Sequence, residues 1–181
     1  ASLLSRHPVT GSLWFPESAL GAKGASEVLL AAERAALPVR FLSNLNSPPG
    51  WNCWLSPFAP GNESSPLCLA QTRGGKKILL TGDMGQRTER WFLESLHPFP
   101  TADVLKVAHH GSRKSSSLDF LHASGAKLAL IGVGKRNRYG HPTAEAIARL
   151  KESGFKVRRT DVEGTVSVYG FDLLTGFTEE I

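Results

Sequence analysis

Two short apolar runs that each end in a polar, glycine-containing turn constrain the fold of this chain most. The first extends from Ile78 to Gly82 and ends on Asp83, and the second extends from Val104 to Ala108 and ends on His109-His110-Gly111-Ser112. Apolar runs of this length, bounded by such turns, are typical of buried strands. Layered α/β proteins carry their ligand-binding groups where such strands end. We therefore expect Asp83, His109 and His110 at one edge of one sheet.

The residue types at this edge are those that bind divalent metal ions. A carboxylate oxygen and imidazole nitrogens are ligands for ions of the Zn²⁺ and Mn²⁺ class. His141, in the turn-rich segment Asn137–Pro142, is a further candidate ligand. Because neighbouring residues of an extended chain point to opposite sides, one of His109 and His110 should face the metal while the other supports it. The spacing leaves open which histidine is the ligand.

Strand and helix patterns alternate along the chain and predict a layered α/β sheet sandwich with outer helices. We expect residues 1–181 to form a single domain, because 181 residues with 41% hydrophobic content can bury a sizeable core. Ser26 and Thr143 precede two helical patterns and are expected N-caps. The expected strands are 11–16, 39–42, 51–58, 67–72, 78–82, 104–108, 127–133, 155–160 and 165–169, and the expected helices are 26–36, 86–96, 118–123 and 144–153.

The aromatic and sulfur-containing residues near the first half of the chain favour packing roles. Trp51 and Trp54 are expected in the core or a groove wall, with base stacking as the alternative. Cys53 and Cys68 are the only cysteines, too few for a disulfide framework, and both lie in apolar, strand-like surroundings. Packing is the favoured role for both, and a single disulfide stays open if adjacent strands bring them together in an extracytoplasmic compartment.

Charge favours a polyanionic partner. The net charge is +5, and DNA is the partner that a basic surface beside a metal edge would hold through its phosphates. Candidate DNA-binding residues flank the metal candidates and are Arg113, Lys114, Lys135, Arg136 and Arg138. The alternative is a domain that is basic only to keep its loops solvated. No run of about 18 apolar residues occurs, so we expect no membrane-spanning helix here.

The order of three motifs resembles a known family. Leu79-Leu80-Thr81-Gly82-Asp83 comes first, His109-His110-Gly111-Ser112 with a serine cluster follows, and Asn137-Arg138-Tyr139-Gly140-His141-Pro142 comes last. This order resembles the C-terminal part of the metallo-β-lactamase-like domain of the ComEC family, the inner-membrane DNA-uptake channels of bacterial competence. The resemblance covers roughly residues 51–169, and Asn62-Glu63-Ser64-Ser65 loosely fits the family's Asn-x-x-Ser element.

The resemblance implies a role for Asp83, and residue chemistry predicts roles for its neighbours. Asp83 matches the carboxylate that bridges two metal ions, and His109, His110 and His141 are the other candidate metal ligands. His110, His141 and Ser112 are the candidate catalytic residues: Ser112 would donate to a phosphate oxygen, and His141 would bind metal or donate to the phosphoryl group. The superfamily's His-x-His-x-Asp-His motif does not occur in this sequence. We therefore expect a fragment of the domain, which by itself binds metal weakly and hydrolyses little.

Three functional hypotheses remain open at this point. The first is a nuclease or phosphodiesterase, with two Zn or Mn ions and no small-molecule cofactor, that degrades the strand that is not imported. The second is a DNA-binding module without catalysis, and the third is another hydrolase of the superfamily. The resemblance also implies a parent protein in the bacterial inner membrane, with this domain on the extracytoplasmic side and the membrane channel portion of the same protein as its partner.

Overall fold

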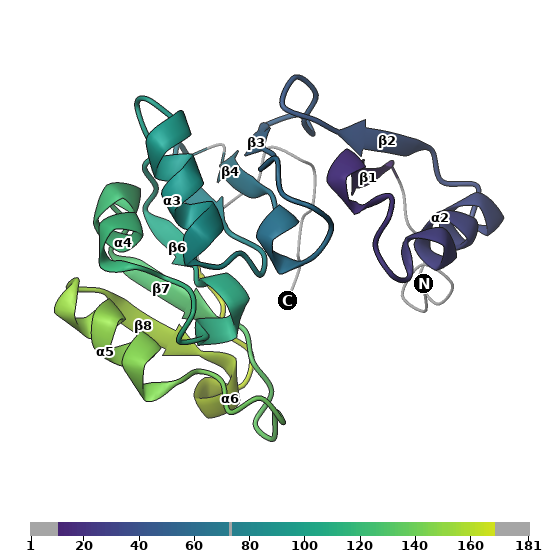
Figure 1. The fold of residues 1–181 in the computed structure, drawn as a ribbon. Helices are drawn as coiled ribbons and strands as arrows, with labels where there is room; N and C mark the ends of the chain where they lie inside the picture. Colours follow the sequence, from purple (N-terminus) through teal and green to yellow (C-terminus); the bar gives the residue numbers. More distant parts are fainter. Residues whose placement is uncertain (1–10, 73, 169–181) are drawn as a thin grey trace.

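A six-stranded mixed sheet forms the centre of the structure, a computed structural model that describes residues 11–72 and 74–168 (Figure 1). The strand order is β3-β4-β5-β6-β7-β8. β3 (Trp51–Trp54), β4 (Leu67–Gln71) and β5 (Lys77–Leu80) pair antiparallel in that order. β5, β6 (Val104–Lys106), β7 (Leu128–Ile131) and β8 (Lys156–Arg159) pair in parallel. The carboxyl ends of the last four strands therefore meet at one edge of the sheet.

Three helices cover one face of this sheet. α3 (Gln86–Ser95), α4 (Leu118–Ser124) and α5 (Ala144–Glu152) lie along the same side in Figure 1. Their apolar side chains, including Phe92, Phe120 and Leu150, form a buried cluster with residues of β5, β6 and β7. The Thr143 hydroxyl accepts a hydrogen bond from Ala146 N and caps α5 as expected. The mixed α/β architecture predicted from the sequence is confirmed.

A smaller unit precedes the main sheet in the chain. β1 (Leu13–Pro16) pairs in parallel with β2 (Val39–Leu42), and the two strands are joined through the short 3₁₀ helix η1 (Glu17–Ala19) and α2 (Ala25–Arg34). This unit lies to the right of β3 in Figure 1. The predicted cap at Ser26 is wrong, because α2 begins one residue earlier and its N-cap is Gly24, with φ of 87°. A left-handed φ favours glycine at that position.

The two cysteines form a disulfide, so the favoured prediction of two packing cysteines is corrected. Cys53 on β3 lies directly opposite Cys68 on β4, and their sulfur atoms are bonded. The two strands bring together side chains 15 residues apart in the sequence. Trp51 and Trp54 are partly buried against the apolar clusters, which agrees with the predicted packing role.

The end of the described chain differs from the prediction. After β8 the backbone forms a short helix, α6 (Thr160–Glu163). Residues 165–168 form no strand, and Tyr169, the last residue of the predicted strand, lies outside the described residues. In the part of the chain that the structure describes, no helix is long and apolar enough to cross a membrane.

Candidate functional site

Asp83 and His110 face each other at the carboxyl edge of the sheet. Asp83 follows β5, and His110 follows β6, the parallel neighbour of β5. His110 Nε2 lies 3.5 Å from Asp83 Oδ1, and each side chain is 44% exposed. His109 N donates to Gly82 O at 3.1 Å, which ties the two strand-end turns together. The pair is therefore fixed by the sheet and open to solvent.

The orientation of the His110 ring identifies which nitrogen faces Asp83 as an acceptor. Nδ1 lies within hydrogen-bond distance of Gly132 O, just beyond β7. A carbonyl oxygen only accepts, so Nδ1 carries the hydrogen, and in the neutral ring Nε2 presents its lone pair to Asp83. Two acceptors 3.5 Å apart would together stabilise a cation placed between them, either a proton or a metal ion. A histidine whose other nitrogen donates to a carbonyl is the usual arrangement of a metal ligand, so these residues fit a metal ion.

The backbone of the two histidines is not extended, which corrects the expectation that they point to opposite sides of a strand. His109 has φ of 47° and ψ of 42°, and His110 has φ of 53° and ψ of 25°, both in the left-handed region. Left-handed backbone costs roughly 1–2 kcal/mol at a residue that is not glycine. Such strain concentrates at functional sites, where surrounding contacts hold it in place. Here the hydrogen bond from Ser112 N to His109 O closes the turn at 3.0 Å.

His141 reaches the same edge from the loop after β7. Its ring centroid lies 5.5 Å from that of His109, and the two rings are nearly perpendicular. Asn137 holds the His141 backbone, because its Oδ1 accepts from His141 N at 2.8 Å and its Nδ2 donates to His141 O at 2.6 Å. Burial lowers the pKa of His141, and the neighbouring His109 and His110 act in the same direction. Among the described residues, its buried Nδ1 has no hydrogen-bond partner.

Residues 62–65, which were not predicted to belong to the site, contact both the Asp83 turn and the histidine turn. The 3₁₀ helix η2 (Asn62–Ser64) places Asn62 Nδ2 3.5 Å from His109 Nε2. Ser65, the next residue, accepts a hydrogen bond from Asp83 N at 3.1 Å. In the sequence, only the loose match of Asn62-Glu63-Ser64-Ser65 to the Asn-x-x-Ser element pointed to this segment. That match did not predict its contacts with His109 and Asp83.

Glu63 and Gly85 fix the start of α3, directly after Asp83. Glu63 Oε2 accepts from Thr88 N at 3.1 Å, in the first turn of the helix, and the same amide also donates to Gly85 O at 3.1 Å. A side chain on Gly85 would collide with the Glu63 carboxylate. Residues 62–65 precede β4, so they hold the Asp83 turn from the side of β5 that faces away from β6, the strand that leads to the histidines.

Lys106 is a second residue that the sequence reading did not place in the site. Its Nζ donates to Gly82 O at 3.2 Å, at the turn that carries Asp83. Burial lowers the pKa of Lys106, and the Asp83 carboxylate opposes that shift. The sequence presents this residue only as the polar position of an apolar strand, which gave no signal of its contact.

The described residues bring together a pair of candidate ligands and not a full set. Within residues 11–72 and 74–168, no group of three or more His, Cys, Asp or Glu side chains is positioned to hold one ion. His109 and His141 thus lie near the Asp83–His110 pair without joining it in one such group. Two metal ions, and their identity as Zn or Mn, stay predictions.

Comparison with known proteins finds several relatives. The chain is 40% identical over 117 residues to ComE operon protein 3 of Bacillus subtilis (strain 168), which covers 62% of this chain and 15% of that protein. It is 36% identical over 98 residues to Competence protein ComA of Neisseria gonorrhoeae, covering 54% of this chain and 14% of that protein. Recombination protein 2 of Haemophilus influenzae is 34% identical over 110 residues, covering 60% and 14% respectively.

The resemblance to the ComEC family is thereby confirmed. No family model matches the sequence. Because the chain spans only about one seventh of each of these relatives, their whole activity does not transfer to it directly.

In this ComEC-like chain a buried carboxylate binds the backbone of the loop that follows the histidines, residues 112–117. Glu89 is fully buried on α3 and accepts hydrogen bonds from Ser116 N and Ser117 N. Burial raises the pKa of Glu89, and the hydrogen bonds from Ser117 and Ser116 oppose that shift. Arg149 on α5 supports the same loop through the carbonyl oxygens of Arg113, Ser115 and Ser116.

The candidate catalytic Ser112 lies at the start of that loop. Its side chain is buried, and its Oγ accepts from Lys114 N at 3.3 Å. The contact gives Ser112 a turn-stabilising role, and donation to a phosphate oxygen stays a prediction.

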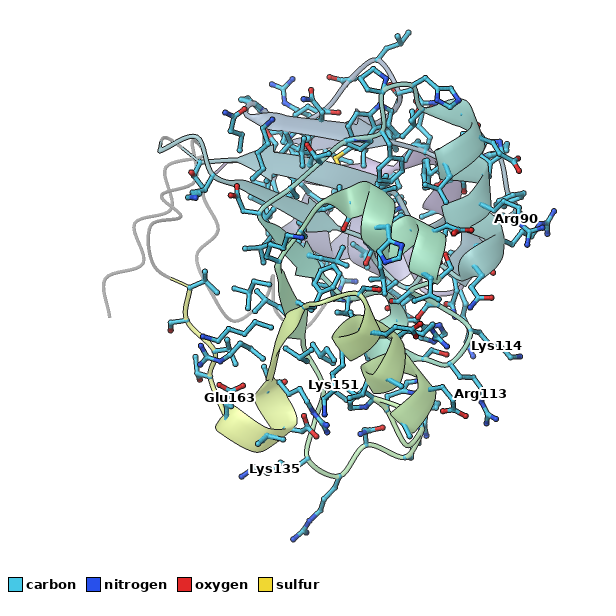
Figure 2. All side chains as sticks on the ribbon, turned by 90° about the vertical axis from the view of Figure 1, so that its left-hand side faces the viewer. Arg90, Arg113, Lys114, Lys135, Lys151 and Glu163 are labelled. Carbon is cyan, nitrogen blue, oxygen red and sulfur yellow. A yellow bond between two sulfur atoms is a disulfide. The ribbon has the colours of Figure 1, made fainter. Side chains whose placement is uncertain are left out.

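The candidate DNA-binding residues of the ComEC-like chain fall into two groups. Arg113 and Lys114 are exposed on the Glu89-supported loop, and Figure 2 shows them together along one edge. Lys135 lies well away from them in the same view. Arg136 and Arg138 are exposed on the loop that carries Lys135. The structure therefore presents two basic loops, both of which precede His141 in the sequence.

Proposed function

We propose that this chain is the C-terminal part of a metal-dependent hydrolase domain with a metallo-β-lactamase-like fold, which cleaves phosphodiester bonds in a ComEC-like DNA channel. The observation that carries the proposal is the Asp83–His110 pair. Its two facing acceptors lie 3.5 Å apart at the carboxyl edge of a parallel sheet. That edge is where α/β proteins bind ligands.

The residues of this chain divide the work of such a site. Asp83 and His110 would hold the metal, and the Gly132 carbonyl keeps His110 in the ligating tautomer. A divalent ion bound there would polarise a phosphoryl oxygen and lower the pKa of a water molecule. His141, neutral because burial lowers its pKa, keeps a lone pair for a metal ion or a hydrogen for a phosphate oxygen. Lys106 keeps positive charge beside the Asp83 turn.

DNA is the substrate that the charge distribution supports. Arg113 and Lys114 are exposed on a loop whose backbone is held by Glu89 and Arg149, so both side chains extend from a defined place in the fold. Such cations hold phosphates through electrostatic attraction and counterion release. Two relatives are named a competence protein and a recombination protein. These names support a role in competence and DNA uptake, with degradation of the strand that is not imported as the reaction.

The disulfide supports the proposed location. Disulfides persist in oxidising compartments and are rare in the cytosol, and Cys53–Cys68 is a cross-strand disulfide in the main sheet. We propose that the parent protein lies in the bacterial inner membrane, with this domain on the extracytoplasmic side beside the channel portion of the same protein.

Cleavage of labelled DNA by the parent protein in the presence of Mn²⁺ or Zn²⁺ tests this function. Asp83→Asn should abolish cleavage and leave DNA binding in place, because it removes a metal ligand and not a phosphate-binding cation. Asp119→Asn, at an exposed carboxylate on α4, is the matched control and should cleave like the wild type. DNA binding without cleavage by any metal-loaded preparation would replace the hydrolase with the DNA-binding module.

Metal titration of the 181-residue chain tests the ligand set separately. We expect weak binding, because the described residues supply a pair of ligands where a zinc site usually has three or four. Isothermal titration with Zn²⁺ and Mn²⁺ measures this. Tight, stoichiometric binding of two ions by this chain would contradict the proposed ligand set.

A further inference from the structure

Tyr139 exposes an aromatic ring beside the candidate site. It lies on the loop between β7 and α5, and 67% of the residue is exposed. Its ring is close to parallel with that of His141, at 21° between planes and 6.1 Å between centroids. His141 in turn contacts His109 edge to face. A line of three rings therefore leads from an exposed loop to the histidine turn.

Hydrogen bonds and close packing fix the backbone of the loop that carries this ring. Asn137 Nδ2 donates to Gly134 O at 3.1 Å as well as to His141 O, and Asn137 Oδ1 accepts from His141 N. At the end of the loop, Thr143 N donates to Gly111 O at 2.9 Å. Gly111 packs so closely on Pro142 that an added Cβ would lie 2.6 Å from Pro142 Cβ. A loop backbone that is already fixed loses less freedom when a ligand binds to the side chains that it carries.

The loop of this ring carries three basic residues, its basic rim, and one of them contacts the ring. Arg138 Nη2 donates to the Tyr139 hydroxyl at 2.8 Å, and its guanidinium carbon lies 5.0 Å from the ring centroid. Lys135 and Arg136 are exposed on the same loop. An exposed aromatic ring with a guanidinium over it and further cations on its loop offers stacking and cation–π contacts for a base and charges for the flanking phosphates, which is how proteins bind single-stranded nucleic acid.

We propose that Tyr139 is a stacking platform for one nucleobase of a single DNA strand, and that it positions the neighbouring phosphodiester at the histidine turn. This inference rests on the proposed function and adds a base-binding subsite to it. The tryptophans considered for stacking are partly buried against the apolar clusters, whereas Tyr139 is exposed beside the site. The basic rim favours a nucleotide over an apolar protein partner.

Binding of two matched oligonucleotides to the 181-residue chain tests the subsite. One is an oligothymidylate of about 12 nucleotides, within the usual site sizes of single-strand binders, and the other has the same length and charge but abasic sugars. Fluorescence anisotropy in EDTA at constant salt measures both affinities without cleavage. Tyr139→Ala should weaken thymidylate binding about 5- to 150-fold, the range for loss of one stacked base, and should leave abasic binding unchanged. Tyr139→Trp should retain thymidylate binding.

Phe41→Ala is the matched control, because Phe41 is an exposed aromatic residue on β2. It should change neither affinity. A thermal melt of each variant checks the fold, and photocrosslinking of an oligonucleotide with one 5-iododeoxyuridine, mapped by mass spectrometry, should label Tyr139 in the wild type.

The outcomes separate this subsite from the proposed hydrolase. Equal losses for both strands in Tyr139→Ala, or no loss for either, would overturn the subsite while metal-dependent cleavage by the parent protein could still stand. Base-dependent binding with a crosslink at Tyr139 would support the subsite even if no cleavage is found. Failure of the wild-type chain to bind either strand would overturn the subsite and the DNA-binding part of the proposed function together.

Discussion

Replacing the buried Glu89 by Gln should destabilise the loop that carries Arg113 and Lys114. The Glu89 carboxylate is fully buried, and each of its oxygens accepts from one backbone amide, Ser116 N on Oε1 and Ser117 N on Oε2. A glutamine has one acceptor oxygen, and its NH₂ group would face the second amide donor. One buried amide would thereby lose its partner.

The magnitude follows from that single lost partner. An unsatisfied buried donor costs about 1–3 kcal/mol, and we expect Glu89→Gln to lower the free energy of unfolding by that amount at acidic pH. A protonated Glu89 avoids the loss, because its hydroxyl oxygen still accepts a weak hydrogen bond when its hydrogen turns away. Arg149 holds the same loop through three carbonyl oxygens, so the loop should loosen without detaching.

The pH dependence has a definite sign. Burial raises the pKa of Glu89 above its ordinary value of 4.5, so the folded state binds more protons than the unfolded state between 4.5 and the raised pKa. The free energy of unfolding of the wild type therefore falls as the pH rises through that window. Glu89→Gln has no carboxyl group to titrate at this position. The difference in free energy of unfolding between the wild type and Glu89→Gln should therefore become smaller above this pH range.

Urea unfolding followed by circular dichroism at several pH values measures both effects. Glu94→Gln makes the same change at an exposed position of the same helix and should match the wild type throughout. The reasoning fails if Glu89→Gln is as stable as the wild type at acidic pH, or if its deficit grows as the pH rises through the window.

Three further predictions concern stability. Serine at both Cys53 and Cys68 should lower the free energy of unfolding by about 3 kcal/mol, the expected effect of a cross-link between residues 15 apart; reductant should lower the Tm of the wild type and leave that of the double variant unchanged. Gly82→Ala should lower the free energy of unfolding by about 1–3 kcal/mol, because Gly82 has φ of 53° and an added Cβ would lie 2.8 Å from Ser65 Cβ. In the same urea titration Gly140→Ala should lower it less, because Gly140 also has a left-handed φ but its added Cβ would meet nothing within 4 Å. Thr143→Ala should cost about 1 kcal/mol through loss of the α5 cap, and a urea midpoint equal to that of the wild type would contradict this.

Local chemistry was enough to predict most elements of the fold. The apolar run before Asp83 and the run before His109 became neighbouring parallel strands, because short buried runs with glycine-containing ends have few other structures. The α5 cap at Thr143 follows from a hydroxyl placed three residues before the helical amide that it accepts from, with no long-range contact required. The strand predicted at residues 165–169 is absent at residues 165–168, where the backbone after α6 has no regular structure.

The sequence by itself determined which chemical groups stand at the carboxyl edge of the sheet, because strand direction and turn position are encoded by nearby residues. Only the tertiary structure decided how those groups are held. The hydrogen bond from His109 N to Gly82 O, the Gly132 carbonyl on His110 and the disulfide at Cys53 depend on partners that lie far along the chain. So do the contact of Asn62 with His109, 47 residues away, and the burial of Glu89 under a loop 27 residues away. Contacts at such separations arise from packing, and no local pattern of residues records them.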